Sequence, residues 1–391
     1  MPDTSLHFPD YRGGGIVNLM SSLATALGAG ESAYPPTPLL PPAALAARRN
    51  IVLMVIDGLG DAFLARTPGG DTLRRYRQGR LTSVFPSTTA TAVTTYLTGA
   101  APQQHGLTGW FTYFKEIGGV IAVLPFRPRL GGAPLTAAGV SPAALFGLTP
   151  LFDRIAVPSY AVSPQAIVDS DFNTALSGRA RRIGYRTLAE YFAAIKQIIQ
   201  ENDARKYIYA YFPDIDALAH EHGIASRQAA ETLTALDTAF AAFLTAIRGS
   251  DTAVILCADH GLIDTTPERR LRLADHPRLE ETLVLPLCGE PRAAYCYVHP
   301  EKRRQFEDYA RTELAHCAVL FDSGQLAAAA RFGQGRPHPR LLERIGHYTL
   351  VMRENYTLKD QLLGERPHPH IGVHGGASAE EMYVPLIVAT V

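Results

Sequence analysis

The sequence has few cysteines, and their spacing carries no motif. Only four are present in 391 residues, and no two of them stand in a C-x-x-C arrangement. Cys257 lies inside an apolar run, as expected for a buried thiol. The pattern gives no indication of a disulfide framework, so the simplest expectation is a cytoplasmic protein with reduced thiols.

Long apolar segments and an excess of either charge are missing as well. The longest apolar run, IVLMVI at 51–56, is far too short to cross a bilayer, and residues 1–30 lack the charged start and apolar centre of a signal peptide. Lys and Arg together number 37, and so do Asp and Glu. This balance gives no excess of positive charge for binding a nucleic acid polymer or an anionic membrane, so neither is expected as a partner. The sequence indicates no oligomeric state.

What is present is typical of a globular protein, with 47% hydrophobic and 19% charged residues. Apolar runs that predict buried strands open the segments 50–64, 207–223 and 252–264, and 382–391 predicts a last strand. Helical periodicity lies between them, at 187–201 and 226–248. Strands that alternate with helices predict an α/β fold with a mostly parallel sheet and helices on both of its faces.

Two segments interrupt this alternation. Residues 108–180 are rich in Gly, Pro and aromatic side chains, and we expect them to be irregular and to line a pocket. Residues 265–370 carry strand and helix patterns of their own, which predict an inserted cap of small α+β character. The expected division is therefore a catalytic α/β core, formed by 1–264 with 371–391, and a cap formed by 265–370.

Asp and His residues cluster directly after the apolar runs. They are Asp57 after the first run, Asp216 and His220 after the second, and Asp259 and His260 after the third, with a fourth group, HPHIGVHGG, at 368–376. Ligands of open α/β sheets bind beyond the carboxyl ends of the strands, so these groups are expected to meet. Each alone is more typical of a turn, but three Asp with three His match a two-metal site, and such mixed ligands suit zinc. Two adjacent cations are a recurrent device for phosphoryl transfer.

The segment FPSTTATAVTTYLTG at 85–99 is rich in hydroxyl groups. Thr favours strands, and Ser and Thr are common at helix N-termini, so composition alone favours a structural role over a nucleophile. On these residues three alternatives stay open: a strand, the start of a helix, and the position of a nucleophile.

Five segments of the chain carry a family resemblance. They are VIDGLGDAFL, FPSTTATAVTTYLTGAAPQQHGLTGW, DIDALAHEHG, CADHGLID and GVHGGASAEEMYVP. With these motifs in this order, the sequence resembles the alkaline phosphatase superfamily and, within it, the type I phosphodiesterase/nucleotide pyrophosphatase branch. The resemblance implies an alkaline phosphatase-like α/β fold and two divalent metal ions, with zinc expected.

Carried over to this chain, the resemblance implies a ligand set for each metal ion. One ion is implied at Asp216, His220 and His374, and the other at Asp57, Asp259, His260 and the hydroxyl of Thr89. Thr89 is the implied nucleophile, because it follows F-P-S-T and lies ten positions before Gly99; Thr88 is the alternative. Zinc would lower the pKa of this otherwise poor nucleophile. The implied reaction is hydrolysis of a phosphate diester through a covalent phosphothreonine.

The resemblance also implies a substrate pocket. Trp110, Tyr113 and Tyr211 are the implied substrate-binding residues, and the expected substrate is a small phosphate ester, nucleotide-like ones included. An Asn that binds a phosphate oxygen is expected three residues after Thr89, but this chain has Ala92 there. The preference for diesters over monoesters therefore stays open at this point.

Two alternative functions also stay open. A phosphomonoesterase or phosphomutase of the same superfamily would use an Arg to bind a terminal phosphate, and the sequence does not single one out among Arg127, Arg129, Arg179 and Arg353. A metal-stabilised binding protein without catalysis is disfavoured, because all six ligand candidates and Thr89 are present. A sulfatase is disfavoured because no C/S-x-P-x-R motif occurs.

Overall fold

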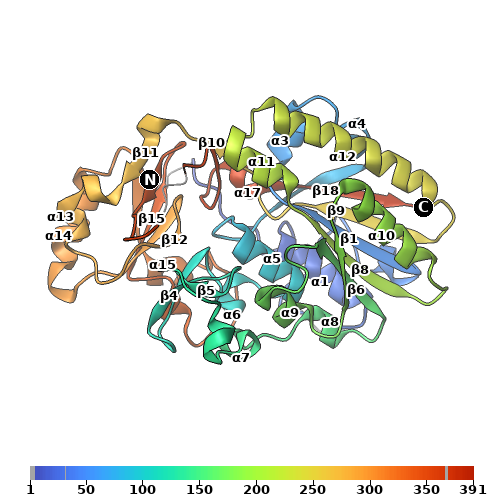
Figure 1. The fold of residues 1–391 in the computed structure, drawn as a ribbon, viewed down its shortest axis with the longest axis horizontal. Helices are drawn as coiled ribbons and strands as arrows, with labels where there is room; N and C mark the ends of the chain where they lie inside the picture. Colours follow the sequence, from blue (N-terminus) through green and yellow to red (C-terminus); the bar gives the residue numbers. More distant parts are fainter. Residues whose placement is uncertain (1–4, 31, 366–368) are drawn as a thin grey trace.

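The computed structural model describes residues 5–30, 32–365 and 369–391. Within these residues, seven strands form the central sheet in the order β2-β18-β9-β1-β8-β6-β7 (Figure 1). They are β2 (Arg77–Thr82), β18 (Tyr383–Thr390), β9 (Thr252–Cys257), β1 (Asn50–Ile56), β8 (Lys206–Phe212), β6 (Ser159–Pro164) and β7 (Arg181–Tyr185). β9, β1, β8, β6 and β7 run parallel, whereas β18 pairs antiparallel with both of its neighbours. The predicted mostly parallel sheet is confirmed.

Helices cover both faces of this sheet (Figure 1). One face carries α3 (Asp61–Arg66), α4 (Asp71–Tyr76), α10 (Leu188–Gln200) and α12 (Arg227–Ala246), and the other carries α1 (Ile16–Ala26), α5 (Thr89–Thr98), α8 (Leu151–Arg154) and α9 (Asp171–Ser177). In α10, Tyr191, Ile195 and Ile198 are buried at the spacing of one helical face, and the Thr187 hydroxyl caps the first turn. The helices predicted at 187–201 and 226–248 correspond to α10 and α12.

The central strands end level with one another, which prepares one edge of the sheet for a site. Every residue of β1 is buried, as its continuous apolar run predicts for a strand covered on both faces. In the register of the sheet, Ile56 pairs with Phe212, and Val55 pairs with Cys257. The loops after β1, β8 and β9 therefore begin side by side.

A second sheet, wholly antiparallel, lies beside the first (Figure 1). Among the described residues it has seven strands: β14 (Ala318–Asp322), β15 (Tyr348–Met352), β13 (Ala293–Cys296), β12 (Cys288–Glu290), β3 (Phe111–Phe114), β4 (Gly119–Ala122) and β5 (Arg127–Pro128). α13 (Pro277–Glu280), α14 (Arg303–Thr312), α15 (Ser323–Ala328) and α16 (Leu341–Arg344) accompany it. The segment just before β3 approaches β12 so closely that a Cβ on Gly109 would lie 2.7 Å from the Cα of Gly289.

The range 108–180 is thus divided between the two sheets. Its first part, 111–128, supplies β3, β4 and β5 to the second sheet, and its last part supplies β6 to the central one. The division into a core and a cap stays a proposal. A buried ion pair joins the two parts: Arg292, just after β12, contacts Glu381 of α17 (Ala379–Met382) at 2.8 Å, with side chains 1% and 0% exposed.

The remaining elements are short. They are α2 (Ala43–Ala46), α6 (Pro102–His105), α7 (Pro142–Phe146), α11 (Asp214–His222), β10 (Ile263–Asp264), β11 (Arg270–Arg272), β16 (Thr357–Lys359) and β17 (Gly372–Val373). A search of the described residues finds no helix with the length and apolar character needed to span a bilayer.

Candidate functional site

The Asp and His residues that the sequence singles out lie together at the carboxyl edge of the parallel sheet. They come from three strand ends and one loop: Asp57 after β1, Asp216 and His220 on α11 after β8, Asp259 and His260 after β9, and His374 after β17. β17 pairs with β10, which follows β9, and this pairing carries His374 to the same edge. His368, in the same stretch of sequence, lies outside the described residues.

Asp57, Asp259 and His260 form a group that is closed to solvent, with side chains 3% exposed or less. His260 Nε2 lies 3.3 Å from Asp57 Oδ1 and 3.4 Å from Asp259 Oδ2. The other oxygen of Asp259 accepts hydrogen bonds from the backbone N–H groups of Gly58 and His260, at 3.1 and 2.9 Å. These two bonds fix the Asp259 carboxylate and turn Oδ2 toward the centre of the group. We call these three residues the closed group.

Asp216, His220 and His374 form a second group, which is half-buried, and we call it the open group. His220 Nε2 lies 3.2 Å from Asp216 Oδ2 and 3.3 Å from His374 Nε2. Asp216 and His220 share a helix face because they are four residues apart. His220 Nδ1 lies 2.8 Å from the Gly372 carbonyl oxygen, so the ring donates its proton there and presents Nε2 to the group.

The two groups adjoin each other and share one electrostatic environment. The rings of His260 and His374 are stacked, with centroids 3.8 Å apart. Burial, and then the charges of Asp259 and Asp216, raise the pKa of Asp57 well above its usual range. Burial acts in the same direction on Asp216, but His220 and then His374 outweigh it and hold the pKa of that carboxyl below its usual range. Three buried carboxylates this close together call for bound positive charge.

The donor set fits two divalent cations. Within the described residues, each group offers three ligand atoms that all lie within 4.8 Å of one another. In each Asp of the site, one oxygen is buried and accepts no hydrogen bond from the described residues: Asp57 Oδ1, Asp216 Oδ1 and Asp259 Oδ2. Such oxygens are costly unless a cation binds them. Carboxylates mixed with imidazoles suit zinc, so the closed and open groups could each hold one zinc ion.

Thr89 lies against the closed group as the first residue of α5. Its Oγ1 is 3.1 Å from His260 Nε2 and 3.5 Å from Asp57 Oδ2. The helix begins here because Thr88 is extended, with φ −141° and ψ 152°. The backbone N–H groups of Thr89 and Ala90 donate no hydrogen bond to the described residues, so the first turn offers two donors to an anion. Ala92, one turn further on, is fully buried, so the position expected to hold an Asn lies within packed protein.

The three aromatic residues expected to bind substrate differ in where they lie. Tyr211, near the end of β8, donates from its hydroxyl to Asp57 Oδ2. Trp110 is 37% exposed, which leaves much of its ring available to a ligand. Tyr113 packs against Tyr297 with ring centroids 5.4 Å apart, so it belongs to the packing of the second sheet.

Two of the four arginines that the sequence raised as phosphate-binding candidates, Arg129 and Arg179, have other partners. Arg129 forms ion pairs with Asp360 at 2.5 Å and Glu365 at 2.9 Å, and its side chain is 3% exposed. Arg179 donates to the carbonyl oxygen of Phe152 at 2.9 Å. Over the described parts of the chain, the hydrogen bonds and ion pairs link no Arg to Thr89 or to either ligand group.

Glu290, the last residue of β12, is a site residue that sequence analysis missed. Its side chain is buried, and Oε1 accepts hydrogen bonds from Thr88 Oγ1 and from the Trp110 backbone N–H, both at 2.7 Å. Burial raises the pKa of Glu290 to about 7, although the two hydrogen bonds act in the opposite direction. No sequence motif marks this residue, because the contact joins positions 202 apart in the chain.

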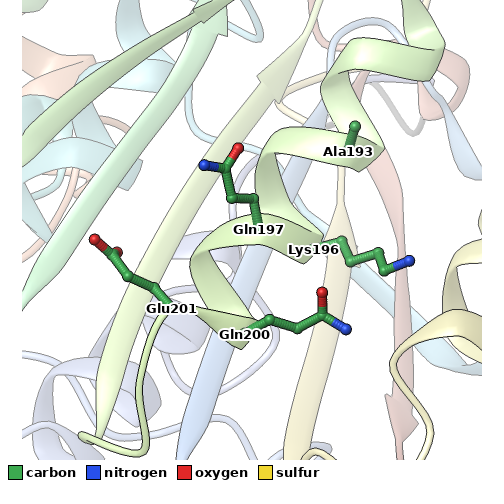
Figure 2. A pocket seen from close by; sticks show the side chains of 5 residues that line it. All are labelled: Ala193, Lys196, Gln197, Gln200 and Glu201. Carbon is green, nitrogen blue, oxygen red and sulfur yellow. The ribbon is translucent and has the colours of Figure 1, made fainter.

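A surface depression along α10 is unrelated to this site. It is lined by Ala193, Lys196, Gln197, Gln200 and Glu201. Figure 2 shows that these side chains fan out from the helix and do not converge on a common point. α10 leads into the amino end of β8, whereas α11 follows its carboxyl end. The depression therefore lies at the end of the sheet opposite the two ligand groups.

Comparison with protein families gives one match that covers most of the chain. The family model described as Type I phosphodiesterase / nucleotide pyrophosphatase matches residues 51–377. This range includes Thr89 and both ligand groups. A search of curated proteins found no match.

Several solved structures share the fold. Mouse ectonucleotide pyrophosphatase/phosphodiesterase 5, as an inactive variant in complex with AMP, has a TM-score of 0.64 and 15% identity over 86% of this chain and 87% of that one. Its human counterpart has a TM-score of 0.63 and 15% identity over the same shares, 86% and 87%. Phosphonoacetate hydrolase from Sinorhizobium meliloti 1021, in complex with phosphonoformate, has a TM-score of 0.63 and 18% identity over 87% and 90%. At these identities the likeness bears on the fold, and the predicted fold class is confirmed.

Proposed function

Because the chain belongs to the type I phosphodiesterase/nucleotide pyrophosphatase family, we propose that it hydrolyses small phosphate diesters at a two-zinc site, with Thr89 as the nucleophile. The prediction that the chain is a hydrolase of this family is confirmed. The metal, the covalent intermediate and the diester preference are the parts that we propose.

One observation carries the proposal: a threonine hydroxyl lies against the closed group, and the open group adjoins that group. Thr89 Oγ1 is 3.1 Å from His260 Nε2, in the closed group. The stacking of His260 on His374 sets the open group directly beside it. A nucleophile beside two adjoining groups of this kind suits an in-line displacement at phosphorus, in which the attacking and leaving oxygens both need stabilisation.

The proposed ligand sets follow the two groups. Asp57, Asp259, His260 and Thr89 Oγ1 would hold one zinc ion, and Asp216, His220 and His374 would hold the other. When bound, zinc would lower the pKa of the Thr89 hydroxyl and offset the negative charge that develops on the reacting oxygens.

The protein's own residues then account for a double displacement. Thr89 Oγ1 loses its proton and forms a bond to phosphorus while the bond from phosphorus to the leaving alkoxide breaks, and the alkoxide takes up a proton and leaves as an alcohol. The backbone N–H groups of Thr89 and Ala90 bind a phosphoryl oxygen. Water then attacks phosphorus, the bond to Thr89 breaks, and a monoester is released. Tyr211 holds Asp57 in place through its hydroxyl, and the exposed ring of Trp110 offers a surface to the leaving group.

The reaction class is tested with two chromogenic esters on the zinc-loaded protein. We expect kcat/KM for bis-p-nitrophenyl phosphate to exceed that for p-nitrophenyl phosphate by about ten-fold or more, because no Arg of the described residues contacts the ligand groups or Thr89. A preference for the monoester would contradict the proposal and favour the phosphomonoesterase alternative.

Replacing His374 with Ala is expected to lower the zinc content from two ions to one per chain. The variant removes one of three ligands from the open group and leaves the closed group intact. Inductively coupled plasma mass spectrometry of the purified proteins measures the change. His222→Ala is the matched control, since His222 lies on α11 but pairs with Glu221, at 3.7 Å, rather than with the open group. Equal zinc content in wild type and His374→Ala would show that His374 is no ligand.

A further inference from the structure

Glu290 brings a buried carboxyl group from the second sheet to the start of the nucleophile helix. The strand that carries it, β12, pairs with β3 at Gly289 and Phe111, which sets Glu290 beside Trp110. A Cβ on Gly375, the residue after His374, would lie 2.6 Å from the Cβ of Glu290. The backbone of Glu290 is therefore wedged between the Trp110 segment and the loop that carries the open group.

Only one oxygen of this carboxyl group is used by the protein. Oε1 accepts both hydrogen bonds, from Thr88 Oγ1 and from the Trp110 N–H, at 2.7 Å each. Within the described residues, Oε2 has neither a hydrogen bond nor an ion pair, and it is not among the buried side-chain atoms that lack a partner. Burial raises the pKa of Glu290 to about 7 although the two hydrogen bonds favour the ionised form, so above that pH Glu290 is an anion beside the start of α5.

No ion pair among the described residues involves Glu290. His260 and Lys359, at the end of β16, both act on it electrostatically, but no ion pair joins either of them to Glu290 in the described parts of the chain. The two proposed cations would neutralise the Asp residues of the closed and open groups, not Glu290. Above its pKa, Glu290 is thus a negative charge that contacts Thr88, the residue before Thr89, and belongs to neither the closed nor the open group.

We propose that Glu290 determines specificity, by placing a fixed negative charge where it disfavours dianionic phosphate monoesters more than monoanionic diesters. This inference rests on the proposed function, and it names the substrate class of the same site. Repulsion scales with the charge of the ligand, so a dianion loses twice the free energy that a monoanion loses at the same place. A diester carries one negative charge, whereas a monoester carries about two above the second pKa of phosphate, near 6.

The test compares the binding of two simple anions to the zinc-loaded full chain by isothermal titration calorimetry at pH ~8.5, where methyl phosphate is a dianion and dimethyl phosphate a monoanion. Glu290→Gln removes the charge and keeps a side-chain oxygen that can accept the hydrogen bonds of Thr88 and Trp110. We expect this variant to bind methyl phosphate about ten-fold more tightly and dimethyl phosphate about three-fold more tightly than the wild type does.

Glu201→Gln is the matched control, because it removes the same charge at the opposite end of the sheet, on the depression of Figure 2. It should change either dissociation constant by less than about two-fold. Lys359→Met supplies a second variant, and removing this cation should weaken the binding of methyl phosphate more than that of dimethyl phosphate. The Lys359 side chain is exposed, so we expect Lys359→Met to fold.

Three results would overturn the proposal. In Glu290→Gln, the dissociation constants of the two anions could change by the same factor, or neither could change. The third result is that Lys359→Met shifts the ratio of the two dissociation constants in the same direction as Glu290→Gln does. The first would mean that Glu290 acts only by holding Thr88 and Trp110. Binding is measured without turnover, so the anion ratio can be read even if the zinc-loaded protein hydrolyses neither chromogenic ester, a result that would count against the proposed function alone.

Discussion

Replacing Thr89 with Ala is expected to lower kcat for diester hydrolysis by about 10⁴-fold, while the fold stays intact. The reason is that the variant removes the oxygen that would bond to phosphorus, and neither ligand group contains another hydroxyl. Thr89 is 8% exposed, and its loss leaves only a small space beside His260. The measurement is steady-state hydrolysis of bis-p-nitrophenyl phosphate, together with zinc content and thermal unfolding of the same samples.

Two matched variants separate the nucleophile from its neighbours. Thr91 lies in the same helix, and its buried hydroxyl has no hydrogen-bond partner among the described residues, so Thr91→Ala should keep its activity within about three-fold. Thr88→Ala removes the hydrogen bond to Glu290 and should cost less than Thr89→Ala. If Thr89→Ala kept the wild-type rate while Thr88→Ala lost it, the nucleophile would be Thr88.

Replacing Arg292 with Met is expected to lower the free energy of unfolding by about 3–5 kcal/mol. Arg292 and Glu381 form two hydrogen bonds, at 3.0 and 2.8 Å, in a place fully closed to solvent. Without the guanidinium, the Glu381 carboxylate keeps its burial but loses its partner, and that uncompensated charge is the source of the cost. Urea denaturation followed by circular dichroism measures the change.

Two further variants check that the buried charge is the cause. The double variant Arg292→Met/Glu381→Leu removes both charges and should recover most of the lost stability. Arg227→Met breaks an exposed ion pair with Glu231 and should cost less than about 1 kcal/mol. A single Arg292→Met variant as stable as Arg227→Met would contradict the account of this ion pair.

Glu381 also links stability to the site. One of its oxygens accepts a hydrogen bond from the backbone N–H of Gly376 at 2.8 Å, two residues after His374. The ion pair that joins the two sheets thus also fixes the loop of the open group. We expect zinc to be held less tightly in Arg292→Met than in wild type, which a competition titration with a chelator would measure.

The central sheet and the gathering of Asp and His residues at its carboxyl edge could be predicted because their causes are local in the sequence. The apolar run of β1 is a strand by composition alone, and Asp57 follows it directly. The spacing of four between Asp216 and His220 is a helical period, so their shared face needs no tertiary information. Parallel strands then bring such residues to one edge, as they do here.

The strands that 111–128 adds to the second sheet could not be predicted, because their link to that sheet joins distant segments. β3 lies in a range rich in Gly, Pro and aromatic residues, and it joins the second sheet by pairing with β12, which lies far along the chain. The same pairing brings Glu290 to Thr88. Sequence analysis therefore missed both β3 and Glu290 for the same reason, which is a contact between distant segments. For Tyr211, the sequence placed the residue at the strand end, but only the structure shows that its hydroxyl contacts Asp57.

The most direct test of the account is a zinc titration of the metal-free protein, followed by hydrolysis of bis-p-nitrophenyl phosphate. We expect no hydrolysis without metal and a rate that rises until two zinc ions are bound per chain, because in the proposed mechanism the closed and open groups each hold one ion. Full activity in the metal-free protein, or no hydrolysis with two zinc ions bound, would contradict it.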